Sequence, residues 1–236
     1  SYDPDAPRPH WDAFVNRVCM GNIELIAFIK RAVGLSLTGD VSEQCLFFVF
    51  GPGANGKSVF FKVLMTIFND YAQKAPSAML AQQKYTPIPN DIARLQGTRF
   101  VVASELDEGM IFDEAKIKDL TGGDAIVARY FRQEFFEFDP RFKLWLYGNH
   151  KPVIRGTDMG IWRRIQLIPF STTITKEEKI PMNKLVASLL KESSGILNWA
   201  LEGYRDYVQN GLAVPATVSN ATTTYKNEQD VVSRFI

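Results

Sequence analysis

Cysteine and histidine are scarce in this sequence, and neither sign of charge is in clear excess. The 236 residues include two cysteines and two histidines, Cys19, Cys45, His10 and His150, with no spacing typical of metal ligands. A zinc site is therefore not expected, and the two thiols fit a reducing, cytoplasmic environment. The formal net charge is +1, so bulk charge gives no support for nucleic-acid binding, and any such contact must come from a local basic patch.

Long apolar runs are also absent. No stretch approaches the ~18 apolar residues of a membrane span, and no signal-peptide pattern opens the chain, so no membrane contact is expected. Hydrophobic residues still make up 46% of the sequence, which is enough to form a core. The chain begins abruptly at Ser1 and stops at Ile236 inside an apparent helix, which suggests an excised fragment.

Hydrophobic periodicity predicts an α/β fold. Helices are expected at 10–33 (two helices), 59–69, 112–120 and 181–210, buried strands at 46–50, 100–103, 142–147 and 164–170, a β-hairpin at 126–130 and 135–138, and irregular structure at 71–90. Strands separated by helices favour a mainly parallel sheet with helices on both faces, which is a three-layer core. The expected regions are a small N-terminal helical region (1–40), the core (41–212) and a tail or the start of a following region (213–236).

A phosphate-binding loop follows the first predicted strand. The motif G-x-x-x-x-G-K-[ST] is matched by Gly51, Pro52, Gly53, Ala54, Asn55, Gly56, Lys57 and Ser58, with Val59 opening the next helix. Glycines let backbone N–H groups converge on phosphates, and the helix N-terminus adds a positive dipole. Lys57 would contact the β- and γ-phosphates, and Ser58 would offer its hydroxyl to Mg²⁺. The sequence therefore predicts binding of a nucleoside triphosphate with Mg²⁺.

An acidic segment ends the second predicted strand. Glu105 is the first candidate to hold Mg²⁺ and to activate water, with Asp107 and Glu108 in support. Ser104 occupies the first of the two places where such a strand usually has an acid, which leaves the division of roles open. The alternative is a solvated acidic loop.

The third predicted strand ends in an amide, Asn149. In P-loop motors an asparagine at this place senses the γ-phosphate and orients the attacking water, although asparagine is also common where a chain merely turns. His150, next to it, is interpreted as structural.

The ordered set GPGANGKS, SELDEG, KDLTGGDAIVARYF, FKLWLYGNHKP and GTDMGIWRRIQLIPF resembles the superfamily 3 helicases, in the phage and plasmid primase branch that includes the poxvirus primase-helicase. The resemblance covers about residues 10–236. It implies an AAA+-like P-loop fold, an N-terminal oligomerisation or collar region, a hexameric ring that hydrolyses ATP between subunits, and movement on single-stranded DNA in replication. It assigns Lys57, Ser58, Glu105 and Asn149 to the A, B and C motifs. Arg163 or Arg164, which the sequence does not separate, would be the arginine finger.

The same resemblance implies that the hairpin between Glu105 and Asn149 points into the ring's pore. We predict its tip at Phe131-Arg132-Gln133-Glu134, with Arg132 as the phosphate contact, Gln133 beside it, and Arg129 and Lys118 as weaker candidates. Related tips often have a Lys-His pair, so the Arg-Gln pair leaves base preference open. Tyr130 and Phe131 could stack on bases, although aromatic residues in hairpins more often pack in a core.

Two other functions fit parts of this pattern. A monomeric P-loop kinase would use the phosphate-binding loop but would not explain Asn149 or the arginine pair. A non-helicase AAA+ remodeller or loader shares all these motifs but would not need Arg132. Further partners suggested by the resemblance are a primase domain or replication proteins. No primase catalytic domain or primase metal site is visible in the sequence.

Overall fold

A five-stranded parallel sheet forms the centre of the protein. The computed structural model describes residues 2–83, 90–104, 107–156 and 158–233. The strands are β1 (Leu46–Phe50), β2 (Ala72–Pro76), β3 (Phe100–Ser104), β6 (Lys143–Gly148) and β7 (Ile165–Pro169), in the order β2-β3-β6-β1-β7. Strand β6 therefore lies between β1 and β3, so the loops after β1 and β6 are neighbours.

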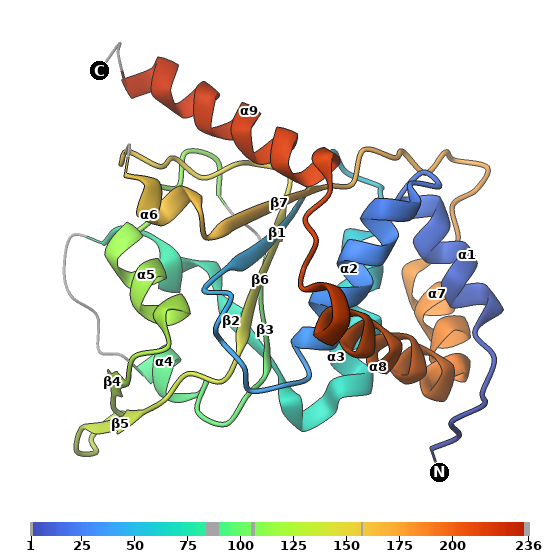
Figure 1. Cartoon of the computed structure of the whole chain (residues 1–236), viewed down its shortest axis with the longest axis horizontal. Coiled ribbons are helices and arrows are strands. Elements are labelled where there is room, and N and C mark those ends of the chain that lie inside the picture. The colour runs from blue at the N-terminus through green and yellow to red at the C-terminus, as the bar shows by residue number, and fades with distance from the viewer. Residues whose placement is uncertain (1, 84–89, 105–106, 157, 234–236) are drawn as a thin grey trace.

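Alternating side chains of the strands supply two hydrophobic cores. In β1, Phe47 and Val49 face one core, whereas Leu46 and Phe48 face the other. Because apolar residues cover both faces of the strand, helices must cover both faces of the sheet. Figure 1 shows this three-layer arrangement, with the sheet between two groups of helices.

The first face is covered by helices from both ends of the chain, namely α1 (Pro9–Val18), α2 (Ile23–Leu35), α3 (Lys57–Phe68), α7 (Met182–Leu189) and α8 (Ser193–Asn210). The other face is covered by α4 (Asn90–Ala93), α5 (Glu114–Gly122), α6 (Met159–Trp162) and the hairpin of β4 (Ile126–Ala128) and β5 (Phe136–Phe138). Short 3₁₀ turns lie at η1 (Asn69–Tyr71), η2 (Ser77–Leu80) and η3 (Leu190–Glu192).

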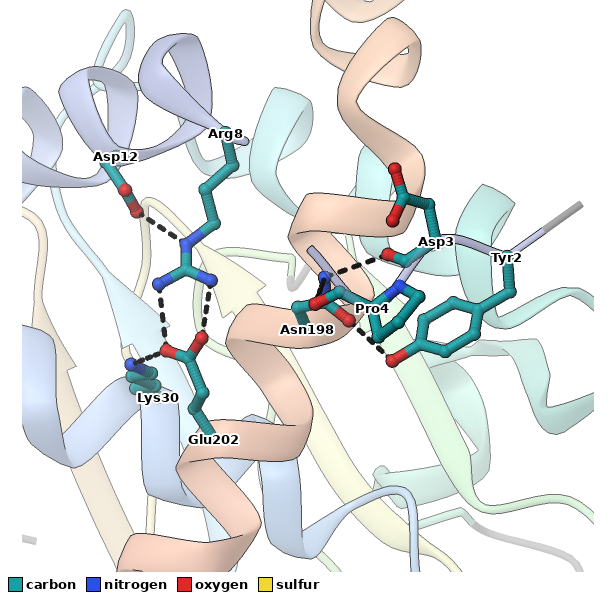
Figure 2. A network of polar contacts seen from close by, with 8 residues as sticks. All are labelled: Tyr2, Asp3, Pro4, Arg8, Asp12, Lys30, Asn198 and Glu202. Carbon is teal, nitrogen blue, oxygen red and sulfur yellow. Dashed lines mark hydrogen bonds and ion pairs between the residues drawn. The ribbon is translucent and has the colours of Figure 1, made fainter. Parts of the chain in front are cut away.

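The N-terminal helices share the first core with the sheet. Helices α2 and α8 approach so closely that a Cβ on Gly34 would lie 2.2 Å from the backbone nitrogen of Tyr204. Figure 2 shows the polar network beside this contact, in which Glu202 accepts two hydrogen bonds from Arg8 (2.7 and 2.8 Å) and one from Lys30 (2.5 Å). The N-terminal helices α1 and α2 are thus packed and hydrogen-bonded onto the core.

Helix α9 (Ala216–Ser233) covers the outer edge of the sheet along β7. The hydroxyl of Thr222 accepts a hydrogen bond from the backbone N–H of Leu167 (3.1 Å), which would otherwise be open at this edge. Tyr225 is fully buried, and its hydroxyl donates to the backbone oxygen of Pro152. The helix therefore protects the edge strand from pairing with other chains.

The predicted fold class, an AAA+-like α/β P-loop core, is confirmed, and the four predicted buried strands agree with the structure to within a residue or two. The prediction of irregular structure over 71–90 was wrong in part, because β2 and η2 lie there. The helix predicted at 112–120 begins instead at Glu114, since the side chain of Asp113 caps it by accepting from the N–H of Lys116. No helix in the described ranges is both long and apolar enough to cross a membrane.

Candidate functional site

The phosphate-binding loop joins β1 to α3, and helix α3 begins at Lys57. Two of its glycines are required by the local geometry. A Cβ on Gly51 would lie 2.1 Å from the backbone oxygen of Phe170, and one on Gly56 would lie 2.6 Å from Val18 of α1. Gly56 also has a φ of +87°, which L side chains rarely adopt. The loop is thus wedged between α1 and the end of β7.

Lys57 lies at the bottom of this loop with only 5% of the residue exposed. Its ammonium donates to the backbone oxygens of Gly51 (2.7 Å) and Pro52 (3.1 Å) and to the amide oxygens of Asn55 (3.0 Å) and Asn149 (2.9 Å). Burial lowers the pKa of Lys57 to about 8. The sequence places Lys57 and Asn149 92 positions apart, and the neighbouring strands β1 and β6 bring them into direct contact.

A cavity of about 670 Å³ opens above Lys57. The cavity is lined by the phosphate-binding loop with Asp107, Glu108, Asn149 and His150. The segment from 174 to 185 also lines it, with the apolar Ile174, Ile180, Met182 and Leu185 and the charged Glu178 and Lys179. The exposed hydroxyl of Ser58 and the carboxylates of Asp107 and Glu108 all line it, and such oxygens are the ligands that Mg²⁺ prefers. Glu105, the first candidate for the Mg²⁺ and water-activating role, lies outside the described residues.

The structure separates the two candidate finger arginines. Arg164 is 8% exposed and donates to Thr121 Oγ1 (3.0 Å) and to the backbone oxygen of Gly160 (2.7 Å), so it is held inside its own subunit. Arg163 is exposed on the surface. Both precede β7, and the backbone oxygen of Arg164 accepts from the N–H of Leu46 at the start of β1. They therefore lie at the amino-terminal ends of the strands, whereas the phosphate-binding loop lies at the carboxyl-terminal ends.

Gln44 is a neighbour of Arg163 that the sequence did not indicate. Its Oε1 accepts from Arg163 Nη2 (2.7 Å), and its Nε2 donates to the backbone oxygen of Gly122 (2.9 Å). Because both ends of the amide are bonded, Gln44 fixes the position of the exposed guanidinium. A glutamine before a strand has no motif of its own, so only the contact reveals this link.

The predicted hairpin exists, but its strands are shorter than expected. Strands β4 and β5 pair over three residues each, and Arg132 and Gln133 are exposed at the turn between them. Arg129 lies at the base of the turn with its guanidinium over the ring of Phe135. Lys118 is not part of this group, because it lies on α5 and forms an ion pair with Asp158. In Figure 1 the hairpin protrudes at the lower left, beyond α4.

A phosphate-binding loop after β1, an asparagine after the adjacent strand β6, and β3 on the far side of β6 are the features of a P-loop NTPase with an AAA+-like core. The fold and the site together define that class of protein.

Comparison with known proteins places the chain within the class. A protein family described as "Family of unknown function (DUF5906)" matches residues 49–164. The "Putative helicase L207/L206" of Acanthamoeba polyphaga mimivirus is 30% identical over 227 residues, which cover 89% of this chain and 24% of that protein. "Primase D5" of Fowlpox virus is 29% identical over 163 residues, which cover 67% of this chain and 20% of that protein. The chain thus spans a quarter or less of the length of these relatives.

Solved structures agree on the fold. The C-terminal region of NrS-1 in its apo form matches with a TM-score of 0.65 at 11% identity, over 88% of this chain and 52% of that one. The motifs, the strand order and the helicase and primase relatives support the superfamily 3 primase-helicase family for this chain.

Proposed function

We propose that this protein is an ATP-driven helicase motor that moves along single-stranded DNA during replication of a viral or plasmid genome. The observation that supports this most is the contact of Lys57 with Asn149 at the base of the cavity. A lysine and an amide that meet where a γ-phosphate would lie suit hydrolysis rather than binding alone. The helicase and primase names of the viral relatives support the choice of DNA as the track.

Each residue of the site has a definable task in this proposal. The ammonium of Lys57, now bonded to four oxygens, would transfer its hydrogen bonds to the β- and γ-phosphates. Asn149 would orient the attacking water, and Glu105 would accept its proton. Ser58, with Asp107 or Glu108, would hold Mg²⁺, which neutralises charge on the phosphates when it is bound. The apolar side chains of Ile174, Ile180 and Leu185 would receive the nucleoside.

Hydrolysis would take place between copies of the chain in a ring, for which the family resemblance suggests six. Arg163 is exposed at the amino-terminal ends of the strands, whereas the cavity lies at their carboxyl-terminal ends. Its guanidinium can therefore contact the nucleotide of a neighbouring copy but not the nucleotide of its own copy. In related P-loop systems such a finger contributes about 10³–10⁵ in rate. DNA would pass the hairpin tips that meet in the centre of the ring.

The proposal is tested by measuring ATP hydrolysis with and without single-stranded DNA, alongside the size of the assembly. We expect DNA to stimulate hydrolysis and Lys57→Ala to abolish it. Mixing Lys57→Ala with Arg163→Ala subunits should restore part of the activity, because some seams then combine an intact lysine with an intact arginine. A monomer that hydrolyses ATP without any response to DNA would contradict the proposal.

The two alternative functions predict different outcomes. A P-loop kinase would transfer phosphate to a small molecule as a monomer. An AAA+ remodeller or loader would assemble and hydrolyse ATP, but Arg132→Ala would leave its activity unchanged. A loss of DNA stimulation with retained basal hydrolysis in Arg132→Ala supports the helicase.

A further inference from the structure

The hairpin tip exposes aromatic rings. Phe131 is 62% exposed and Phe135 59%, and both lie in the seven-residue connection between β4 and β5. Twelve phenylalanines of the described residues are buried in the two cores, so two exposed rings on one turn are unusual here. Exposed apolar groups that cluster on a surface generally mark a binding site.

Each of these rings already has an arginine on it. The guanidinium of Arg129 lies 4.7 Å from the ring centre of Phe135, and that of Arg132 lies 5.1 Å from the ring centre of Phe131. A cation on one face of a ring leaves the other face free for a second flat partner. The arginines are therefore placed to hold the rings as well as to meet phosphates.

The turn itself is anchored to the body of the protein. The hydroxyl of Tyr130 donates to the backbone oxygen of Ala93 (3.1 Å), and its ring stacks on Phe136, so Tyr130 supports the hairpin. The N–H of Phe131 donates to the side-chain oxygen of Asn90 (3.2 Å). Because these bonds fix the turn before any ligand arrives, little conformational entropy is lost on binding.

The charge of the hairpin argues against phosphate neutralisation as the main source of affinity. Between Ile126 and Phe138, Arg129 and Arg132 are balanced by Glu134 and Glu137. A hairpin with no net charge releases few counterions, so its binding to DNA should depend only weakly on salt. Base stacking on aromatic side chains does not need net charge, and it contributes roughly tenfold or more per base.

We propose that Phe131 and Phe135 are base-stacking platforms, and that the hairpin holds single-stranded DNA mainly through its bases. This inference rests on the proposed helicase function and assigns the contact with the strand within it. It differs from the expectation of a phosphate contact at Arg132, and it adds Phe135, which the sequence did not single out.

The test compares two tracks that share a backbone. Affinity is measured for a 20-nucleotide oligothymidine and for an abasic oligonucleotide of equal length, with a non-hydrolysable ATP analogue present. The unchanged protein should bind the oligothymidine at least tenfold more tightly. The double variant Phe131→Ala/Phe135→Ala should bind both tracks alike, at the affinity of the abasic track, with an unchanged salt dependence.

Val208→Ala provides the matched control, because Val208 is 64% exposed on α8, on the other face of the sheet. It should change neither affinity, whereas Phe131→Tyr with Phe135→Tyr should retain the preference for bases. Equal binding of both tracks by the unchanged protein, or an equal loss on both tracks in the double variant, would overturn the stacking role. Failure of the unchanged protein to bind either track would overturn the helicase proposal itself, and the stacking role with it.

Discussion

Arg163 and Arg164 are adjacent in sequence, yet their replacement should have opposite consequences. Arg164→Ala removes two hydrogen bonds of a buried guanidinium, to Thr121 and to the backbone of Gly160. Hydrogen bonds to charged groups contribute roughly 1.5–3 kcal/mol each, and relief from burying the charge offsets part of the loss. We therefore expect the free energy of unfolding to fall by about 2–3 kcal/mol.

Arg163→Ala removes one hydrogen bond at an exposed site, to Gln44, so the expected loss of stability is roughly 0.5 kcal/mol. For a chain of this length 1 kcal/mol shifts the melting temperature by about 2–4 °C. Thermal unfolding should thus show a decrease of roughly 5–10 °C for Arg164→Ala and of about 1–2 °C for Arg163→Ala. The ATPase rate measured well below both transitions should fall by about 10³ or more for Arg163→Ala.

Two outcomes of these measurements would contradict the roles assigned to Arg163 and Arg164. Equal melting temperatures for the two variants would show that Arg164 is not held as the contacts indicate. If the Arg164→Ala protein is stable but inactive while the Arg163→Ala protein is active, Arg164 rather than Arg163 is the arginine finger.

Three further predictions concern pH and packing. Hydrogen bonds from Arg8 lower the pKa of Glu202 to about 2. The stability that Glu202 contributes is therefore complete above its ordinary pKa of 4.5 and is lost as the pH falls towards 2. Urea unfolding should show Glu202→Gln to be less stable than the unchanged protein at pH 6 and equally stable near pH 2. Burial lowers the pKa of Lys57 to about 8, so the side chain loses its charge above that pH. Calorimetry should show that the affinity for ATP falls by up to tenfold per pH unit above pH 8. The variant Lys57→Arg should lack this pH dependence. Gly34→Ala places a Cβ 2.2 Å from the backbone nitrogen of Tyr204, so helices α2 and α8 must separate. The free energy of unfolding, measured by chemical denaturation, should fall by about 3 kcal/mol. A loss below about 1 kcal/mol would contradict this packing.

The strands of the core could be predicted from the sequence because they are buried on both faces. Strand β1 is five apolar residues in a row, and such runs leave little choice of structure. Strand β2 was missed because it lies at the edge of the sheet, where Gln73 and Lys74 interrupt the apolar pattern and Pro76 ends it. Edge strands can have polar residues and proline because one side makes no ladder hydrogen bonds.

The site was predictable in its parts but not in its arrangement. Spacing alone indicates that Lys57 and Asn149 each follow a strand, whereas their contact depends on β6 lying next to β1, which is a matter of strand order. Arg163 and Arg164 cannot be separated by composition or period, because the chain turns from α6 into β7 at these residues. The exposure of Phe135 was also unpredictable, since an aromatic residue next to a strand usually packs inward.

The geometry of the sheet explains why one copy of this chain would not suffice for the proposed reaction. Arg163 precedes β7, whose register with β1 starts at Ile165 and Leu46, and Lys57 follows the other end of β1. Strand β1 has five residues, and at about 3.3 Å per residue its two ends lie roughly 16 Å apart. This distance is far beyond the reach of the Arg163 side chain, which Gln44 holds at the amino-terminal ends of the strands. A guanidinium and a phosphate-binding lysine that act on the same nucleotide must then come from different copies. If Arg163 acts in the reaction, assembly is a condition of catalysis, and the ATPase rate per subunit should rise with protein concentration until the ring is complete.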